Sequence, residues 1–140
     1  MSAYKKIECN IVDKDTLLEA LKLLGLKTEV FNEPRHLFGY KGDQRQETAH
    51  IVVLRQELNE KFTGASNDIG FLWNGKKYDF IISDYDKKFK VDQRVIQAYV
   101  KVALEKALAK QGYKIKVNIN DEEFLKRTMS EMEIVARKII

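Results

Sequence analysis

The pair Asn74-Gly75 constrains the fold of this chain more than any other feature of its sequence. Asn and Gly both tolerate positive φ, and a two-residue type I′ turn needs positive φ at both of its positions. The pair therefore predicts a tight β-hairpin, and counting outward from the turn places Phe71 opposite Tyr78. Residues two apart share a face of a strand, so the hairpin should carry one apolar surface. Its members are Ile69, Phe71, Trp73, Tyr78, Phe80 and Ile82.

A long amphipathic helix is predicted downstream of the hairpin, over residues 91–111, with Gly112 as its stop. Its apolar residues recur at the three- and four-residue spacing of one helical face, and charged residues lie off that face. A hairpin face and a helical stripe of this kind are expected to bury each other. The stripe consists of Ile96, Tyr99, Val100, Ala103, Leu104, Ala107 and Leu108.

Length and composition favour one soluble globular domain over residues 1–140, with residues 121–140 as a C-terminal extension. The single Cys9 cannot form an intrachain disulfide, and its place in an alternating segment predicts a small buried residue. No apolar run approaches the ~20 residues of a membrane span, and no signal peptide is evident. We expect no membrane association and a cytoplasmic location, or an organelle stroma if the gene is plastid-encoded.

The first half of the chain is expected to alternate strands with one helix. Residues 4–12 should form a strand with one buried face, and a helix should follow, with Asp13 or Asp15 as its N-cap and Gly25 at its end. Residues 27–31 look like a second strand that Pro34 breaks or borders. A short strand over residues 37–42 is expected next.

A continuous apolar run then predicts a central strand over residues 48–54, covered on both faces, after a polar loop at 43–47. Residues 55–67 are predicted to be a loop with at most one turn of helix, and residues 83–90 a polar connection. Residues 113–119 alternate cleanly and predict another strand.

Residues 121–140 are compatible with a helix throughout or with a helix to about Ser130 followed by an edge strand. The order of elements predicts an α+β fold, in which an antiparallel sheet has its helices packed on one face as a two-layer sandwich.

Residues capable of catalysis do not converge in the sequence, so we do not expect an enzyme, although an uncharacterised enzyme stays an alternative. His36 and His50 lie in a predicted turn and before a predicted strand, and neither has a patterned partner. Asp84 and Asp86 resemble the start of a calcium loop, but lysines follow where oxygen ligands are needed. We expect no metal and no cofactor.

Basic and aromatic residues cluster on either side of residue 80. Bases stack on aromatic rings while lysines contact phosphates, so an exposed cluster of this kind predicts single-stranded nucleic-acid binding as an alternative function. Interleaved aspartates reduce the six positive charges to a net of two. The candidate contacts are Lys76, Lys77, Lys87, Lys88, Lys90 and Arg94, near Trp73, Tyr85 and Phe89.

Short landmarks are scattered between residues 2 and 117: Ser2-Ala3-Tyr4, Leu24-Gly25, Gly39-Tyr40, Asp68-Ile69-Gly70-Phe71, Gln97-Ala98-Tyr99 and Gln111-Gly112-Tyr113. Together they resemble the hypothetical chloroplast reading frame 35 family, also called domain of unknown function 1257. The chain departs from the family pattern at Ala3 and Val100, where the family often has histidines, and at residues 83–85.

The resemblance implies no catalytic mechanism, because the family has no established catalytic residues. It suggests an adaptor role, because genes of the family often lie beside genes of AAA-type ATPases. We therefore expect a non-enzymatic protein-interaction module, with an AAA-type ATPase as a candidate partner. The expected interaction surface joins the outer sheet face or edge near Phe38 and Tyr40 to the connection at Tyr85 and Phe89.

Overall fold

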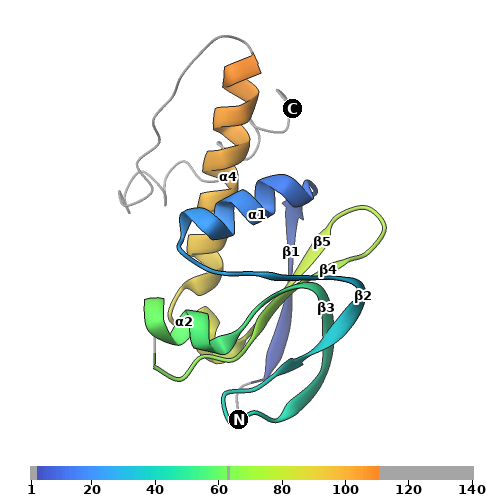
Figure 1. Cartoon of the computed structure of the whole chain (residues 1–140), viewed down its shortest axis with the longest axis vertical. Helices are drawn as coiled ribbons and strands as arrows, with labels where there is room; N and C mark the ends of the chain where they lie inside the picture. Colours follow the sequence, from blue (N-terminus) through green and yellow to red (C-terminus); the bar gives the residue numbers. More distant parts are fainter. Residues whose placement is uncertain (1–2, 63, 111–140) are drawn as a thin grey trace.

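The computed structural model describes residues 3–62 and 64–110, and it contains one five-stranded antiparallel sheet in the order β1-β5-β4-β3-β2 (Figure 1). The predicted helix stop at Gly112, the predicted strand at 113–119 and the segment 121–140 lie outside these residues. The elements in chain order are β1 (Tyr4–Ile11), α1 (Lys14–Leu23), β2 (Glu29–Phe38), β3 (Gln44–Val53), α2 (Arg55–Lys61), β4 (Ile69–Trp73), β5 (Tyr78–Ser83), α3 (Asp84–Lys88) and α4 (Val91–Lys110).

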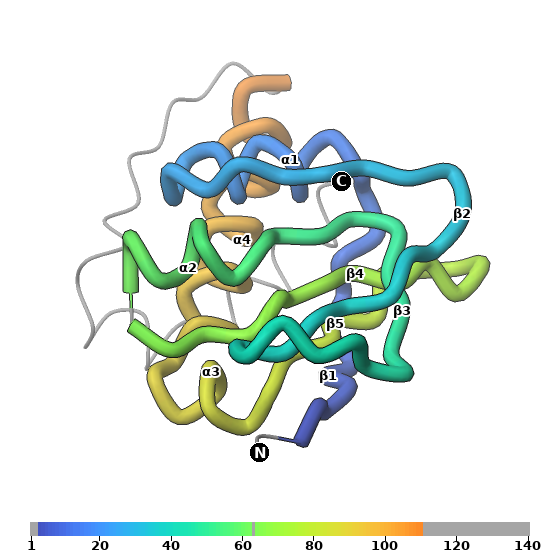
Figure 2. Tube along the Cα trace, turned by 60° about the horizontal axis from the view of Figure 1, so that its bottom comes forward, coloured from blue at the N-terminus to red at the C-terminus, as the bar shows by residue number. Residues whose placement is uncertain are grey.

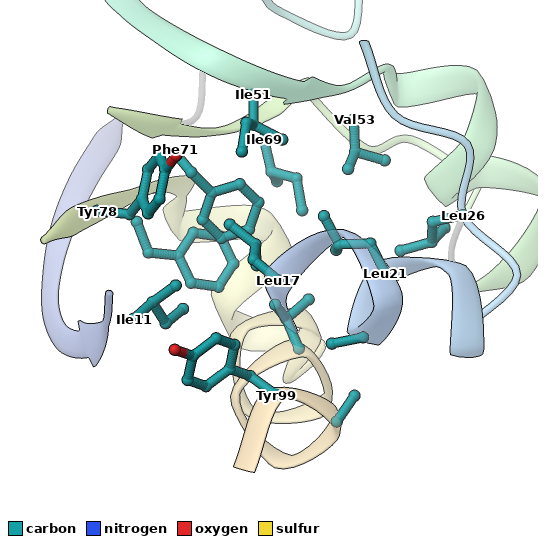
Figure 3. Packing of buried hydrophobic residues seen from close by; sticks show 14 of the residues in the cluster. Ile11, Leu17, Leu21, Leu26, Ile51, Val53, Ile69, Phe71, Tyr78 and Tyr99 are labelled. Atoms are coloured by element: carbon teal, nitrogen blue, oxygen red, sulfur yellow. The ribbon is translucent and has the colours of Figure 1, made fainter. Parts of the chain in front are cut away.

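The main core lies between one face of the sheet and the helices α1 and α4, which confirms the predicted α+β sandwich (Figure 3). Phe71 and Phe80 pack at 4.5 Å between ring centroids on the sheet side, and Leu17 and Leu21 of α1 face them. All four side chains have no exposed surface. The predicted apolar face of the hairpin is thus the floor of the core, except at Trp73, which is 39% exposed.

Helix α1 begins and ends where the sequence predicts. The Asp13 carboxylate accepts a hydrogen bond from the Thr16 backbone N–H at 3.2 Å, which satisfies one of the free donors of the first turn. Leu24 caps the other end, and Gly25 follows at φ +78°, where a residue without Cβ has no steric cost.

The register of the β4–β5 hairpin differs from the prediction by two residues, although the predicted faces are correct. Trp73 lies opposite Tyr78 and Phe71 opposite Phe80, so four residues rather than two form the turn. Gly75 has φ +99°, whereas among the described non-glycine residues only Lys90 has positive φ, which excludes type I′ geometry at Asn74. The Asn74 side chain instead accepts the N–H groups of Lys76 and Lys77 at 2.9 and 3.0 Å.

The two strands predicted around Pro34 are one strand, β2, and the loop predicted at 43–47 is the start of β3. Pro34 is tolerated because β2 is an outer strand and its pairing with β3 shifts register between Val30 and Arg35. The connection therefore shrinks to a tight turn, closed by a hydrogen bond from Gly39 N–H to the Asp43 carbonyl at 2.9 Å.

Strand β3 is covered on both faces, as predicted, but it lies next to the outer strand β2, and β4 is the central strand of the sheet. Ile51 and Val53 join the main core, whereas Val52 joins a second cluster with Leu37, Ala49 and Ile81 on the opposite face of the sheet. The β2–β3 hairpin supplies Leu37 and Ala49 to this cluster, which means that it folds back over its own sheet. Much of the outer face proposed for partner binding is consequently internal.

Helices replace parts of two stretches that were predicted to be irregular. Helix α2 occupies part of the predicted loop 55–67, and α3 lies within the predicted polar connection 83–90. The single stripe predicted for α4 is divided between two faces, because Tyr99 and Ala103 enter the main core while Val100 and Leu104 form a separate cluster. Val91, Val95, Ala98 and Val102 complete the core side of α4.

Candidate protein-interaction surface

A buried polar loop, residues 66–68, joins three parts of the fold. The Asp68 carboxylate accepts the backbone N–H of Phe38 at 2.9 Å and that of Arg55 at 2.8 Å, so it fixes the end of β2 to the start of α2. The Tyr4 hydroxyl donates to the Asp68 carbonyl at 2.7 Å, which adds the start of β1. Asp68 is only 1% exposed, and burial raises the pKa of its carboxyl group above the ordinary value, against the effect of these N–H donors.

Asn67 connects the turn between β2 and β3 to helix α3. Its side-chain oxygen accepts the Tyr40 N–H at 2.9 Å, and its side-chain amide donates to the Ser83 hydroxyl at 2.8 Å. Its backbone N–H donates to the Asp86 carboxylate at 3.0 Å, and Ser83 donates to the same carboxylate at 2.8 Å. One fully buried residue therefore holds Tyr40 and α3 in a fixed relation.

Three aromatic side chains gather around this junction, and we call Tyr40, Tyr85 and Phe89 the aromatic surface. Tyr40 is 44% exposed and Phe89 is 47% exposed. The rings of Tyr85 and Phe89 lie 4.9 Å apart on α3 and at its C-cap. Figure 2 shows the β2–β3 turn beside α3. Phe38, the fourth residue predicted for the interaction surface, is half-buried, and its backbone N–H donates to the Asp68 carboxylate.

The backbone next to Phe89 is held in a strained conformation. Lys90 has φ +61°, in the left-handed region that costs a residue with Cβ about 1–2 kcal/mol. Its N–H donates to the Lys87 carbonyl at 2.9 Å, and its carbonyl accepts the Arg94 N–H at 3.2 Å, so the residue forms the corner between α3 and α4. Strained residues of this kind concentrate at functional sites.

Around the aromatic surface, two carboxyl groups are buried and three lysines are exposed. Asp86 and Asp92 are 0% and 8% exposed, and burial raises the pKa of both carboxyl groups above the ordinary value. Lys87, Lys88 and Lys90 are exposed. The Lys41 ammonium lies 5.5 Å from the centre of the Tyr40 ring. The surface thus presents aromatic rings among lysines.

The six predicted nucleic-acid contacts do not form one surface. Lys76 and Lys77 lie in the β4–β5 turn, whereas Lys87, Lys88 and Lys90 lie beyond the opposite end of β5. A strand of that length separates them by about 20 Å. Arg94 stacks over the Phe62 ring at 5.1 Å, and Trp73 packs against Tyr78 at 4.9 Å.

The sequence-based reasoning missed the residues that hold the aromatic surface together, namely Asn67, Asp68, Ser83 and Asp86. One signal for them exists in the sequence. Ser83 and Asp86 have the spacing of a capping box, and Ser83 is indeed the N-cap of α3 and accepts the Asp86 N–H at 3.2 Å. Asn67 and Asp68 carry no comparable local pattern, because their partners are distant in the chain.

The family comparison agrees with the resemblance noted from the landmarks. A family model described as "Protein of unknown function (DUF1257)" matches residues 20–128. The comparison with curated proteins and the comparison with solved structures each found no match. Within the described residues, no helix has the length and apolar character needed to cross a membrane.

Proposed function

Because the chain belongs to the DUF1257 family, whose function is not known, we propose its role from its own surface: it is a protein-interaction module that docks a partner on the aromatic surface. The observation that carries this proposal is the pair of exposed rings, Tyr40 and Phe89, fixed relative to each other through buried Asn67. Aromatic side chains on a rigid support are typical anchors of protein interfaces.

The chemistry of the surface defines the partner that fits it. Exposed rings take up apolar side chains, while Lys41, Lys87 and Lys88 favour carboxylates. The partner segment should therefore combine one or two apolar anchors with acidic neighbours. The family resemblance makes an AAA-type ATPase the first candidate for this partner. The chain would then act as an adaptor bound to the ATPase, in the cytoplasm or in an organelle stroma.

Capture experiments test the proposal. The tagged chain is incubated with lysate of its own host, with and without nuclease, and bound proteins and nucleic acids are identified together. We expect to capture a protein partner whether or not nuclease is present. The substitution Phe89→Ala should weaken the affinity of the chain for this partner about 30-fold, which corresponds to a hot-spot loss of about 2 kcal/mol.

Trp73→Ala is the matched control, because Trp73 is an exposed aromatic residue at the far end of the β4–β5 hairpin. It should bind the partner like the parent chain. Equal losses for Phe89→Ala and Trp73→Ala would contradict the proposed surface. Recovery of nucleic acid alone, with affinity that falls steeply with salt, would replace the proposal by nucleic-acid binding.

A further inference from the structure

The imidazole of His50 completes the hydrogen bonding at the loop end of the β4–β5 hairpin. Pairing of β3 with β4 ends at Ile51 and Phe71. Trp73, the last residue of β4, donates its backbone N–H to His50 Nδ1 at 3.1 Å. The imidazole therefore takes the place that a backbone carbonyl of β3 would hold in a longer ladder.

His50 reaches this N–H because β3 bends away from β4 at the preceding residue. A Cβ at position 70 would overlap the Ala49 Cβ, so Ala49 lies over β4 rather than beside it. Ala49 pairs with Arg35 of β2 and belongs to the cluster on the outer face of the sheet. His50 is thus the residue at which the β2–β3 hairpin turns over the sheet.

The bond from Trp73 fixes the protonation state of the His50 ring. A ring nitrogen that accepts a hydrogen bond carries no proton, so the ring must be neutral, with its proton on Nε2. Protonation would place a second N–H against the Trp73 N–H, and the bond would be lost.

His36, the other histidine of the chain, has the opposite requirement. Its Nδ1 lies 2.7 Å from the Arg45 carbonyl oxygen, which can only accept a hydrogen bond. This nitrogen therefore carries a proton whether the ring is neutral or charged. Of the two imidazoles, only that of His50 loses its hydrogen bond when it is protonated.

We propose that His50 is a protonation switch, which holds the loop end of the β4–β5 hairpin closed when it is neutral and releases it when it is charged. Histidine side chains change charge between about pH 5 and about pH 8. Figure 1 shows that this loop projects from the body of the sheet, so it can open while the core stays packed. The switch controls how the exposed Trp73 ring and Lys76 are presented, at the opposite end of β5 from the aromatic surface.

The charged groups around His50 offer no ion pair that would offset the lost bond. Strand β4 carries no titratable residue. On β2, Glu33 lies in the irregular segment opposite His50, next to Arg35, and β3 itself carries Arg45 and Glu47. Within residues 3–62 and 64–110, none of these groups forms an ion pair with the His50 ring. Protonation should therefore weaken the closed state.

Amide hydrogen exchange of the full chain, followed by NMR, tests the switch at the bond itself. The protection factor of the Trp73 amide, corrected for the intrinsic exchange rate, should fall about tenfold in the parent chain between about pH 7.5 and about pH 5.5. The substitution His50→Asn should keep this amide protected at both pH values, because the Asn oxygen is an acceptor that does not titrate. His36→Gln, the matched control, should show the same fall as the parent chain.

Three outcomes of the exchange experiment would overturn the proposal. The first is a Trp73 protection factor that does not change with pH in the parent chain. The second is a fall in His50→Asn as large as in the parent chain, since another group would then be responsible. The third is a fall that disappears in His36→Gln. If His50→Asn does not fold, the parent chain and His36→Gln still decide the question.

Quenching of fluorescence by acrylamide adds a measurement that needs no assigned amide. Trp73 is the only tryptophan of the chain. Its quenching constant should rise about 1.5-fold on acidification of the parent chain and stay constant in His50→Asn. A constant value in the parent chain would contradict the proposal. Neither measurement bears on the aromatic surface, which the capture experiment tests separately.

Discussion

Asp68 and Asp86 bring carboxyl groups into the interior without a fully compensating ion pair. Asp68 has the Arg55 guanidinium at 3.5 Å, and the Arg55 side chain is 23% exposed. Asp86 accepts hydrogen bonds from Asn67 and Ser83. Neutral buried carboxyl groups are easier to accommodate than charged ones. The stability of the fold should therefore depend on pH in a direction opposite to that of ordinary salt-bridged carboxylates.

Burial raises the pKa of Asp86 above its ordinary 3.8, although the Asn67 N–H and the Ser83 hydroxyl oppose the shift. A raised folded-state pKa gives stability that is complete below pH 3.8 and is lost as pH rises through the folded pKa. Compared with Asp86→Asn, the parent chain should lose free energy of unfolding as pH rises from about 4 to about 7. Urea unfolding of both proteins over this pH range measures their free energies of unfolding. A parent chain that becomes more stable relative to Asp86→Asn as pH rises would contradict the prediction.

The backbone of Lys90 is strained, and the substitution Lys90→Gly should relieve this strain. At φ +61° glycine has no Cβ penalty, so the free energy of unfolding should increase by up to about 1 kcal/mol. Lys87→Gly, within α3, is the control and should decrease it by about 1 kcal/mol, because glycine disfavours helix. Thermal unfolding compares the two, and a loss of stability in both would show that the Lys90 side chain matters more than its backbone.

The sequence allowed part of the candidate site to be predicted at this scale. Tyr40 was chosen as part of a sheet face or edge and Phe89 as part of a polar connection, and both are exposed. Asn67 was assigned to a loop, since polar residues near a glycine usually face water, and Asp68 to the start of the hairpin stretch. Their burial depends on Phe38, Arg55 and Asp86, which no local pattern connects to them.

Among the elements, the β2–β3 hairpin lies in close contact with β4. A Cβ at position 70 would overlap the Ala49 Cβ and lie 3.0 Å from Leu37 Cδ2, so glycine lets the hairpin fold onto β4. Gly70→Ala should cost about 1–3 kcal/mol of unfolding free energy through overpacking.

Ala49→Gly in the Gly70→Ala background should recover part of this loss, and the double-mutant cycle should give a coupling of about 1 kcal/mol or more. Additive effects in chemical unfolding would show that the two positions do not touch.

Elements were easier to predict from the sequence than their pairing. The apolar faces of β4 and β5 were correct although the register was wrong, because a shift of two residues keeps every side chain on its face. The conformation of the turn depends on the Asn74 side chain, whose oxygen accepts hydrogen bonds from the backbone N–H groups of Lys76 and Lys77. The backbone rule for two-residue turns does not include such side-chain bonds. Pro34 was taken as a strand boundary, but an outer strand with irregular pairing accommodates it.

At the scale of the whole molecule, the lysines among the predicted nucleic-acid contacts divide between the two ends of β5, and this division gives a further prediction. Charge reversal at Lys87 and Lys88 should weaken partner capture about tenfold, since these lysines flank the aromatic surface. Charge reversal at Lys76 and Lys77 should leave capture unchanged. Both double variants change the net charge equally, so parallel binding curves at two salt concentrations separate a local effect from a general one. Equal losses would indicate that the overall charge, rather than the aromatic surface, attracts the partner.

The two outer strands of the sheet also differ in how they meet other chains. Strand β2 carries Pro34, which has no N–H to offer, and an irregular backbone that another strand cannot follow in register. This side of the sheet is thereby protected against edge-to-edge aggregation. Self-association through strand addition is left to the β1 side, and pairing of two β1 edges uses up both of them, so this association should stop at a dimer rather than continue into a fibre.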